Sequence, residues 1–264
     1  MNNNEYIALL LTCIAGLSTG IGSFLALYKK PSDKILASGM GLSAGVMIYI
    51  SLAKLLVESE KHFEIIESSY TSEILTSMSF IGGMAIVFLI NKFISFNKNP
   101  HQMFGFEKGT DKQQKILRTG ILTAIILSIH NFPEGLATYA SSVYNIELGI
   151  NITFAIALHN IPEGLAVAIP IYYATNNKTK AFIFSFLPGM TEPIGGLLGY
   201  FFLTNMFNDF SFGIIMASVA GIMVFISFDQ LIPAAIKTKE YMATVYGIIL
   251  GIILMQFSLN FHFH

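Results

Sequence analysis

Apolar residues dominate this chain in long runs that short polar stretches separate. A helix needs about 20 mainly apolar residues to cross the hydrocarbon of a bilayer, and the intervals between charged residues provide eight such runs. The expected spans are 6–28, 35–57, 74–95, 117–141, 148–174, 181–204, 210–236 and 241–261. The polar, non-periodic segment 96–115 contains proline and glycine and is expected to be a mobile cytoplasmic loop. The pattern predicts an all-α polytopic membrane protein, with residues 1–264 in a single transmembrane domain.

Composition supports a membrane location. Hydrophobic residues make up 53% of the 264 residues and charged residues 12%, whereas a typical soluble domain has about 25% charged residues. The single cysteine, Cys13, excludes an intrachain disulfide framework and a multi-thiolate metal cluster. With a net charge of -1 and no basic patch, the chain is expected to bind no nucleic acid and to have the lipid bilayer as its surroundings.

The connections between the predicted helices alternate between basic and acidic. Connections after the first, third, fifth and seventh helix carry 13 of the 15 basic residues, whereas the other connections are acidic apart from Lys61. Basic residues near helix ends are retained on the cytoplasmic side. The basic connections are therefore predicted to be cytoplasmic, and the N and C termini extracytoplasmic.

Two segments in the second and seventh helices resemble each other. Residues 44–56 (AGVMIYISLAKLL) and 220–232 (AGIMVFISFDQLI) share six of thirteen positions. The two helices cross in opposite directions, so helices 1–3 and 6–8 are predicted to form an inverted repeat around the helix 4–5 pair, as in many secondary transporters. Shared apolar composition alone is the alternative. Four small-xxx-small pairs, which let helices approach closely, are Gly16/Gly20, Gly41/Gly45, Gly195/Gly199 and Gly247/Gly251.

A second repeat carries the candidate chemistry. Residues 130–137 (HNFPEGLA) and 159–166 (HNIPEGLA) agree at seven of eight positions. In each copy a histidine and a glutamate stand four residues apart, so both side chains project from one helix face. Adjacent helices run antiparallel, which brings the two copies together near the middle of the membrane.

Acidic side chains within the predicted membrane helices are costly unless another group offsets their charge. An ionised carboxylate at the bilayer centre costs about 2.5–3.5 kcal/mol even on the most lenient scale, and the predicted spans contain Glu134, Glu163, Glu192 and Asp229. A bound dication would offset this cost. Histidine, carboxylate and amide ligands suit zinc, iron(II), manganese or cobalt. The alternative is that these groups only hydrogen-bond one another between helices.

Other polar residues have less defined roles. Lys54 is expected to extend its ammonium toward the membrane surface, and Gln230 occupies the position that Lys54 has in the other repeat. The remaining histidines are expected in loops or at the tail, exposed and solvated: His62, His101, His262 and His264.

The doubled HNxPEG motif, the eight spans, the external termini and the charged third loop resemble the ZIP (Zrt/Irt-like) divalent-metal transporters, in particular bacterial ZupT-like members. The resemblance implies uptake of Zn²⁺ into the cytoplasm across the cell (inner) membrane, with Fe²⁺, Mn²⁺, Co²⁺ and Cd²⁺ also accepted. It also implies an elevator-like movement of helices 1, 4, 5 and 6 against helices 2, 3, 7 and 8, often in a homodimer. The metals are transported substrates, and no cofactor is expected.

The resemblance also assigns metal ligands at a binuclear centre. His130, Glu134 and Glu163 match one metal position, and Asn131, Asn160, Glu163 and Glu192 match the other, with Glu163 bridging. His159 lines the exit path or assists either metal. Many relatives have an acid near Lys54, a second acid near Gln230, an aspartate at Asn160 and a histidine cluster around His101, and this chain departs from each of these patterns.

Two other classes of protein remain as alternatives to a transporter. Two metal ions about 3.5–4 Å apart can activate water, as in a membrane-embedded di-metal hydrolase. The chain has no HExxH pair and no nucleophile motif, so it is expected not to be an enzyme. A non-transporting metal sensor is the other alternative, although it should carry an output domain.

Overall fold

The computed structural model describes residues 3–28, 32–94, 110–203 and 208–260. Most of the predicted 96–115 loop therefore lies outside the described residues, as do His101, His262 and His264. Helix α5 begins at Thr110, inside the segment that the sequence assigned to the loop. Residues 110–115 contain no proline or glycine, and lysine and glutamine are good helix formers, so a helix can start there.

The described residues are all-helical, and eight helical runs are long and apolar enough to cross a membrane. This confirms the predicted all-α class with eight transmembrane helices. Three of the runs contain a π-helical turn, and the sixth is broken between α7 and α8. In order the elements are α1 (Asn3–Tyr28), α2 (Asp33–Ile50), η1 (Ser51–Leu55), α3 (Leu56–Glu64), α4 (Ser69–Ile94), α5 (Thr110–Tyr144), α6 (Ile146–Thr175), α7 (Lys178–Phe186), α8 (Thr191–Leu198), η3 (Gly199–Leu203), α9 (Asp209–Ile226), η4 (Ser227–Leu231), α10 (Ile232–Lys237) and α11 (Tyr241–Asn260).

Short polar connections set where several helices begin. The side chain of Asn145 accepts the backbone N–H of Leu148 at 3.0 Å and starts α6 directly after α5. Asn208 and Ser211 form a reciprocal capping box at the start of α9. These caps satisfy N–H groups that the first helical turn leaves without partners. The cap at Asn145 allows a tight reversal, so α5 and α6 lie antiparallel.

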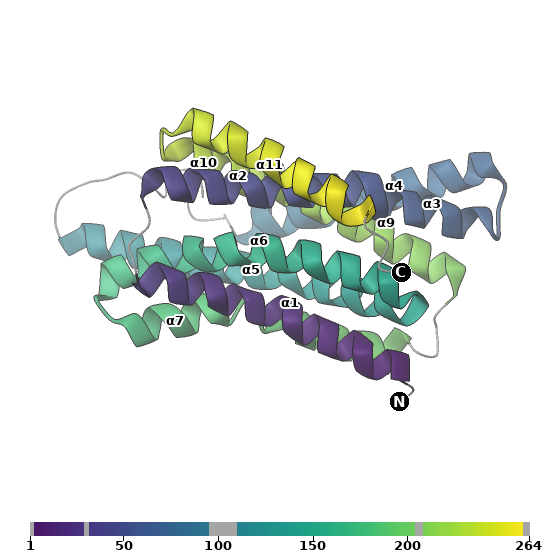
Figure 1. Cartoon of the computed structure of the whole chain (residues 1–264), viewed down its shortest axis with the longest axis horizontal. Helices are drawn as coiled ribbons and strands as arrows, with labels where there is room; N and C mark the ends of the chain where they lie inside the picture. The colour runs from purple at the N-terminus through teal and green to yellow at the C-terminus, as the bar shows by residue number, and fades with distance from the viewer. Residues whose placement is uncertain (1–2, 29–31, 95–109, 204–207, 261–264) are drawn as a thin grey trace.

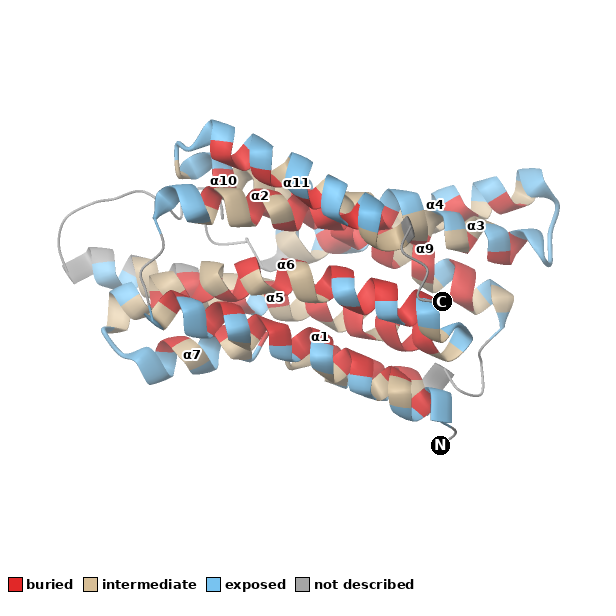
Figure 2. Cartoon of the chain, in the orientation of Figure 1, coloured by how far each residue is buried: buried red, intermediate tan, exposed pale blue. Residues whose placement is uncertain are grey.

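The helices form two layers, which Figure 1 shows one above the other. Helices α1, α5, α6, α7 and α8 contact one another in one layer, and helices α2, α3, α4, α9, α10 and α11 contact one another in the other. The layers meet chiefly where α2 lies against α6. The core between them is apolar and includes Met47, Ile156 and Met216. Apolar side chains are also exposed around the outside of the bundle, as expected of a surface that faces lipid (Figure 2).

Glycines permit the closest helix contacts. A Cβ at Gly41 or Gly45 of α2 would collide with the backbone of α11, and a Cβ at Gly247 or Gly251 of α11 would collide with the backbone of α2. In the other layer, a Cβ at Gly16 would collide with the carbonyl of Gly189. These contacts confirm that small-xxx-small pairs of this chain lie at helix interfaces.

The two segments of the first repeat share a local distortion. Each contains a five-residue π-helical turn at the same place in the repeat, Ser51–Leu55 in one and Ser227–Leu231 in the other. Such turns occur frequently at functional sites. The inverted relation of the two three-helix halves and the orientation of the termini remain predictions.

Charges gather at opposite ends of the bundle. The α3–α4 turn and the starts of α6 and α9 lie at one end (Figure 1), and they carry mostly acidic residues such as Glu64, Glu147 and Asp209. The starts of α2 and α7 and the end of α10 lie at the other end, with mostly basic residues such as Lys178 and Lys237. We call these the acidic end and the basic end.

Candidate metal centre

The two copies of the HNxPEG motif lie side by side in the core. His130 and Glu134 are on α5, and His159 and Glu163 are on α6, which is separated from α5 by the single residue Asn145. All four side chains are buried, and His130, the most exposed of them, retains 2% of its accessible surface. The structure therefore brings both copies into one buried cluster.

Each histidine pairs with the glutamate of the other copy. His130 Nε2 lies 3.3 Å from Glu163 Oε1, and His159 Nε2 lies 3.2 Å from Glu134 Oε2. In an antiparallel pair, the beginning of one motif lies level with the end of the other. Exchange of partners between the copies follows from this arrangement.

Glu192 joins the site from the broken sixth span. Residues 187–190 form turns between α7 and α8, which places Glu192 in the first turn of α8, fully buried. Its Oε1 accepts hydrogen bonds from Asn160 Nδ2 at 2.5 Å and from Asn131 Nδ2 at 3.4 Å. Asn160 Nδ2 also donates to the carbonyl of Ala15 at 2.9 Å. These three side chains form a second polar cluster that connects α1, α5, α6 and α8.

Close helix approach makes these contacts possible. A Cβ at Gly135, one residue after Glu134, would collide with the backbone of Glu192. A Cβ at Gly164, one residue after Glu163, would collide with the carbonyl of Thr19. The glycine of each motif therefore lets a neighbouring helix come within reach of the polar side chains.

The site has unused hydrogen-bonding capacity. A buried polar atom without a partner costs about 1–3 kcal/mol, and such atoms are uncommon in native interiors. Among the described residues, seven atoms at the predicted metal ligands are buried and make no hydrogen bond: His130 Nδ1, Asn131 Oδ1, Glu134 Oε1, His159 Nδ1, Asn160 Oδ1, Glu163 Oε2 and Glu192 Oε2. All seven side chains that the sequence indicated as ligands thus contribute an atom that could bind an additional group.

The side chains that could ligate a metal form hydrogen-bonded pairs in this conformation. Within the part of the chain that the structure describes, no three His, Cys, Asp or Glu side chains surround a common ion position. The His–Glu hydrogen bonds occupy Nε2 and carboxylate oxygens that could otherwise ligate a metal. Metal ligation by three of these side chains therefore requires side-chain rotation from the arrangement described here.

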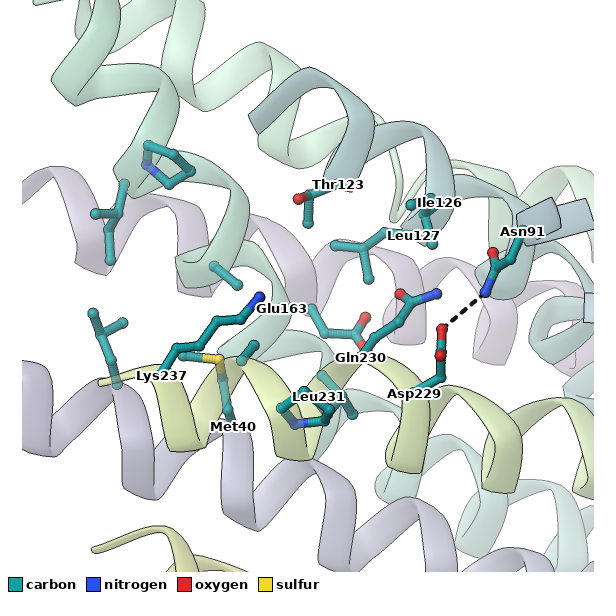
Figure 3. A pocket seen from close by; sticks show the side chains of 16 residues that line it. Met40, Asn91, Thr123, Ile126, Leu127, Glu163, Asp229, Gln230, Leu231 and Lys237 are labelled. Atoms are coloured by element: carbon teal, nitrogen blue, oxygen red, sulfur yellow. Dashed lines mark hydrogen bonds between the residues drawn. The ribbon is translucent and has the colours of Figure 1, made fainter. Parts of the chain in front are cut away.

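A cavity of about 160 Å³ extends from Glu163 between the two layers. That volume exceeds what one water molecule needs. Its walls come from α2, α4, α5 and α6 and from the stretch that runs from η4 into α10, and they are mostly apolar (Figure 3). Its polar lining residues are Asn91, Thr123, Glu163, Asp229, Gln230 and Lys237. Because Lys237 is at the end of α10, the cavity leads from the site toward the basic end.

Asn91 is a partner that the sequence did not indicate. Its Nδ2 donates to Asp229 Oδ2 at 3.0 Å across the contact between α4 and η4 (Figure 3). Nothing in the sequence separates Asn91 from other polar residues near a helix end. Asp229, which stood out as an acid within a span, lines the cavity together with Gln230.

Lys54 pairs with a carboxylate one helical turn away. Its Nζ lies 3.2 Å from Glu58 Oε1, and Lys61 Nζ lies 3.1 Å from the same oxygen. The Glu58 side chain is 13% exposed and that of Lys54 is 29% exposed. Lys54 therefore extends toward the acidic end and not toward Glu134 or Glu163.

The expectation that His62 is a solvated loop residue is wrong. His62 lies on α3 and is 2% exposed, because the second span continues as helix beyond 57 to Glu64. Its Nδ1 is 2.7 Å from Asp209 Oδ1, and its ring contacts Tyr144 and Phe212 at centroid distances of 4.3 and 4.2 Å. The aromatic contacts and the carboxylate account for the burial of this histidine.

The chain is similar to known proteins over most of its length. Residues 98–258 match the family model described as ZIP Zinc transporter. The chain is 46% identical to a protein named Zinc transporter ZupT from Clostridium perfringens, over 97% of this chain and 96% of that protein. It is 44% identical to the Zinc transporter ZupT of Streptococcus mutans and 43% identical to that of Chlorobium chlorochromatii, in each case over 98% of both chains. The similarity thus extends over nearly the whole chain.

Proposed function

Because the chain belongs to the ZIP family of metal transporters, and is a multi-pass membrane protein, we propose that it carries Zn²⁺ into the cytoplasm through the buried centre on α5, α6 and α8. The names of its relatives are those of transporters and not of enzymes. Fe²⁺, Mn²⁺, Co²⁺ and Cd²⁺ are proposed as further substrates, since imidazole, carboxylate and amide ligands suit all of these ions to some degree.

The unpaired polar atoms at the site carry this proposal. Seven buried atoms at the centre have no hydrogen-bond partner within the protein, and a buried polar atom without a partner is unfavourable. A dication would bind several of them and would also offset the charge of Glu134, Glu163 and Glu192. Because binding gives these atoms partners, even weak ligands such as amides can help to hold the ion.

We assign the ligands to two metal positions. His130, Glu134 and Glu163 hold the first ion, and His159, which pairs with Glu134, assists there. Asn131, Asn160, Glu163 and Glu192 hold the second ion, with Glu163 bridging. Binding at the first position replaces the two His–Glu hydrogen bonds, and binding at the second turns the Asn131 and Asn160 amide oxygens toward the ion.

The cavity supports a direction of transport. Basic residues mark the cytoplasmic side of membrane proteins, and the cavity leads from Glu163 to the basic end. Toward the acidic end, the route is filled by apolar side chains of the core, including Ile152 and Ile156 on α6 and Ile50 on α2. Both observations support the assignment of this conformation to a state in which the centre is accessible from the cytoplasm and closed to the outside.

The layered fold supports an elevator-like movement. The predicted moving helices form one layer and the predicted static helices form the other. Two side-chain hydrogen bonds between described residues cross the boundary, and both are weak. Ser43 Oγ donates to the carbonyl of His159 at the long distance of 3.4 Å, and Ser141 Oγ donates to the thioether Sδ of Met216, a weak acceptor, at 3.5 Å. An apolar boundary with weak polar contacts allows sliding, because few hydrogen bonds must break.

Metal competition in reconstituted vesicles tests the proposal. Purified protein is reconstituted, and zinc uptake is followed with a metal-sensitive dye inside while each competing ion is added outside. We expect competition by Fe²⁺, Mn²⁺, Co²⁺ and Cd²⁺ and none by Mg²⁺, which binds few nitrogen ligands. For stoichiometry, metal analysis of the dialysed protein should give two ions per chain in the wild type and one in Glu192→Ala.

A further inference from the structure

A lysine lines the cavity that Glu163 borders. The cavity next to Glu163 is lined by 16 residues, and Lys237 is the one basic residue among them. In Figure 3, its side chain extends from α10 into the space that Glu163 faces from α6. A positively charged side chain in a cation pathway is unexpected and requires an explanation.

The local helix geometry directs Lys237 into the cavity. Gln230, Ala234 and Lys237 are spaced i, i+4 and i+7 along the continuous run from η4 into α10, and all three line the cavity. Residues with this spacing share a helix face. Lys239 lies beyond the end of α10 with a left-handed backbone (φ 65°), and it does not line the cavity. The placement of Lys237 thus follows from its position on the helix, and Lys239 provides a natural comparison.

Glu163 and Lys237 line the same cavity, whose walls include the aliphatic side chains of Leu36, Ala166 and Ile169. The other polar lining residues include Asn91, Asp229 and Gln230. Lys237 is an exposed residue, so its side chain also reaches water. Its positive charge raises the electrostatic energy of a dication bound near Glu163 and opposes the return of an ion that has left.

Metal release leaves the carboxylates of the centre without their counterion. Coulomb interactions are strong where water is limited. The positive charge of Lys237 in the same cavity therefore lowers the electrostatic energy of these carboxylates once the metal has left.

We propose that Lys237 acts as a tethered cation that speeds metal release to the cytoplasm, by repelling the ion bound near Glu163 and by partly offsetting the negative charge that the ion leaves behind. This inference rests on the proposed metal centre. It assigns Lys237 an electrostatic role in the transport cycle and no role as a metal ligand. Removal of the charge should slow zinc dissociation and strengthen zinc binding in the cytoplasm-accessible state.

The experiment measures zinc release from the full chain in detergent. Protein loaded with zinc is mixed in a stopped-flow instrument with an excess of a fluorescent zinc chelator. We expect Lys237→Gln to release zinc about fivefold to tenfold more slowly than the wild type, the effect of one charge on a dication across a partly hydrated cavity. Lys237→Arg keeps the charge and should release zinc at the wild-type rate, as should Lys239→Gln. Lys237→Met serves as the neutral variant if Lys237→Gln does not fold.

Two results would overturn the inference. One is zinc release by the neutral variants at the wild-type rate, and the other is equally slow release by Lys237→Arg, since size and not charge would then matter. A separate measurement tests the centre itself, because Glu163→Ala should lose the zinc-binding signal. If Glu163→Ala binds and releases zinc normally, the proposed centre is wrong. If Glu163→Ala loses binding while the Lys237 variants behave like the wild type, only the inference about Lys237 is wrong.

Discussion

His130 and Glu163 lie 3.3 Å apart across the contact of α5 with α6, although each belongs to a different copy of the repeated motif. The reciprocal pair, His159 with Glu134, is separated by 3.2 Å. Each helix thus supplies one imidazole and one carboxylate to the other. Neither helix can form this centre alone, and a change in either motif alters both pairs.

Glu163 should matter more for transport than Glu192. Glu163 pairs with His130, borders the cavity and is assigned to both metal positions, whereas Glu192 is assigned to one. Zinc uptake into vesicles should therefore fall further in Glu163→Ala than in Glu192→Ala. Both variants must be compared at equal protein abundance in the membrane. Equal uptake by Glu163→Ala and the wild type would refute the bridging assignment.

An aspartate at position 160 should make the fold more dependent on metal. Asn160→Asp removes the donor that bonds Glu192 Oε1 and the Ala15 carbonyl, and it places a second carboxylate beside Glu192. The empty protein should lose stability, by about 1–3 kcal/mol for the unpaired groups alone. Zinc should restore it, because a dication neutralises the added charge. Thermal unfolding in detergent with and without zinc measures both effects, and an unchanged midpoint without zinc would contradict the predicted role of the amide.

Two neighbouring glycines on α4 should respond differently to the same substitution. A Cβ at Gly83 would collide with the carbonyl of Ser218 on α9, whereas a Cβ at Gly82 would meet nothing within 4 Å. Gly83→Ala should lower the unfolding midpoint by roughly 2–12 °C, since overpacking costs about 1–3 kcal/mol and each kcal/mol shifts a chain of this size by about 2–4 °C. Gly82→Ala is the matched control and should leave the midpoint unchanged or raise it slightly. Equal destabilisation by both variants would argue against the α4–α9 contact.

Zinc should stabilise the folded protein through this centre. A ligand at 100 times its dissociation constant adds about 2.7 kcal/mol of stability. The unfolding midpoint of the wild type should rise with zinc and return to its starting value after chelation. Glu163→Ala should show little of this rise, whereas Lys239→Gln should show all of it. A full zinc-dependent rise in Glu163→Ala would place the stabilising ion elsewhere.

The hydropathy pattern was sufficient to predict the membrane helices, and the repeated motif was sufficient to predict the buried cluster. Eight apolar runs specify eight helices because length and polarity decide whether a helix can span a bilayer. The antiparallel arrangement of two neighbouring helices then brings His130 near Glu163. Both inferences depend on local sequence and on the connection between adjacent elements.

Contacts between segments that are distant in the sequence were harder to predict. The Asn91–Asp229 hydrogen bond joins residues 138 positions apart, and no local pattern marks Asn91. The burial of His62 depends on Tyr144 and Phe212, which lie on other helices. The direction of Lys237 depends on the π-helical turn at Ser227–Leu231 that precedes it. These features arise from tertiary packing, which a single sequence does not specify residue by residue.

The most direct test of the central claim measures binding and transport in the same preparation. Wild-type protein and Glu163→Ala are reconstituted in vesicles that contain a zinc-sensitive dye, and bound zinc is quantified in parallel. The account predicts that the wild type binds zinc and delivers it to the vesicle interior, and that Glu163→Ala does neither at a comparable rate. Zinc binding by the wild type without delivery, or undiminished delivery by Glu163→Ala, would contradict transport through this centre.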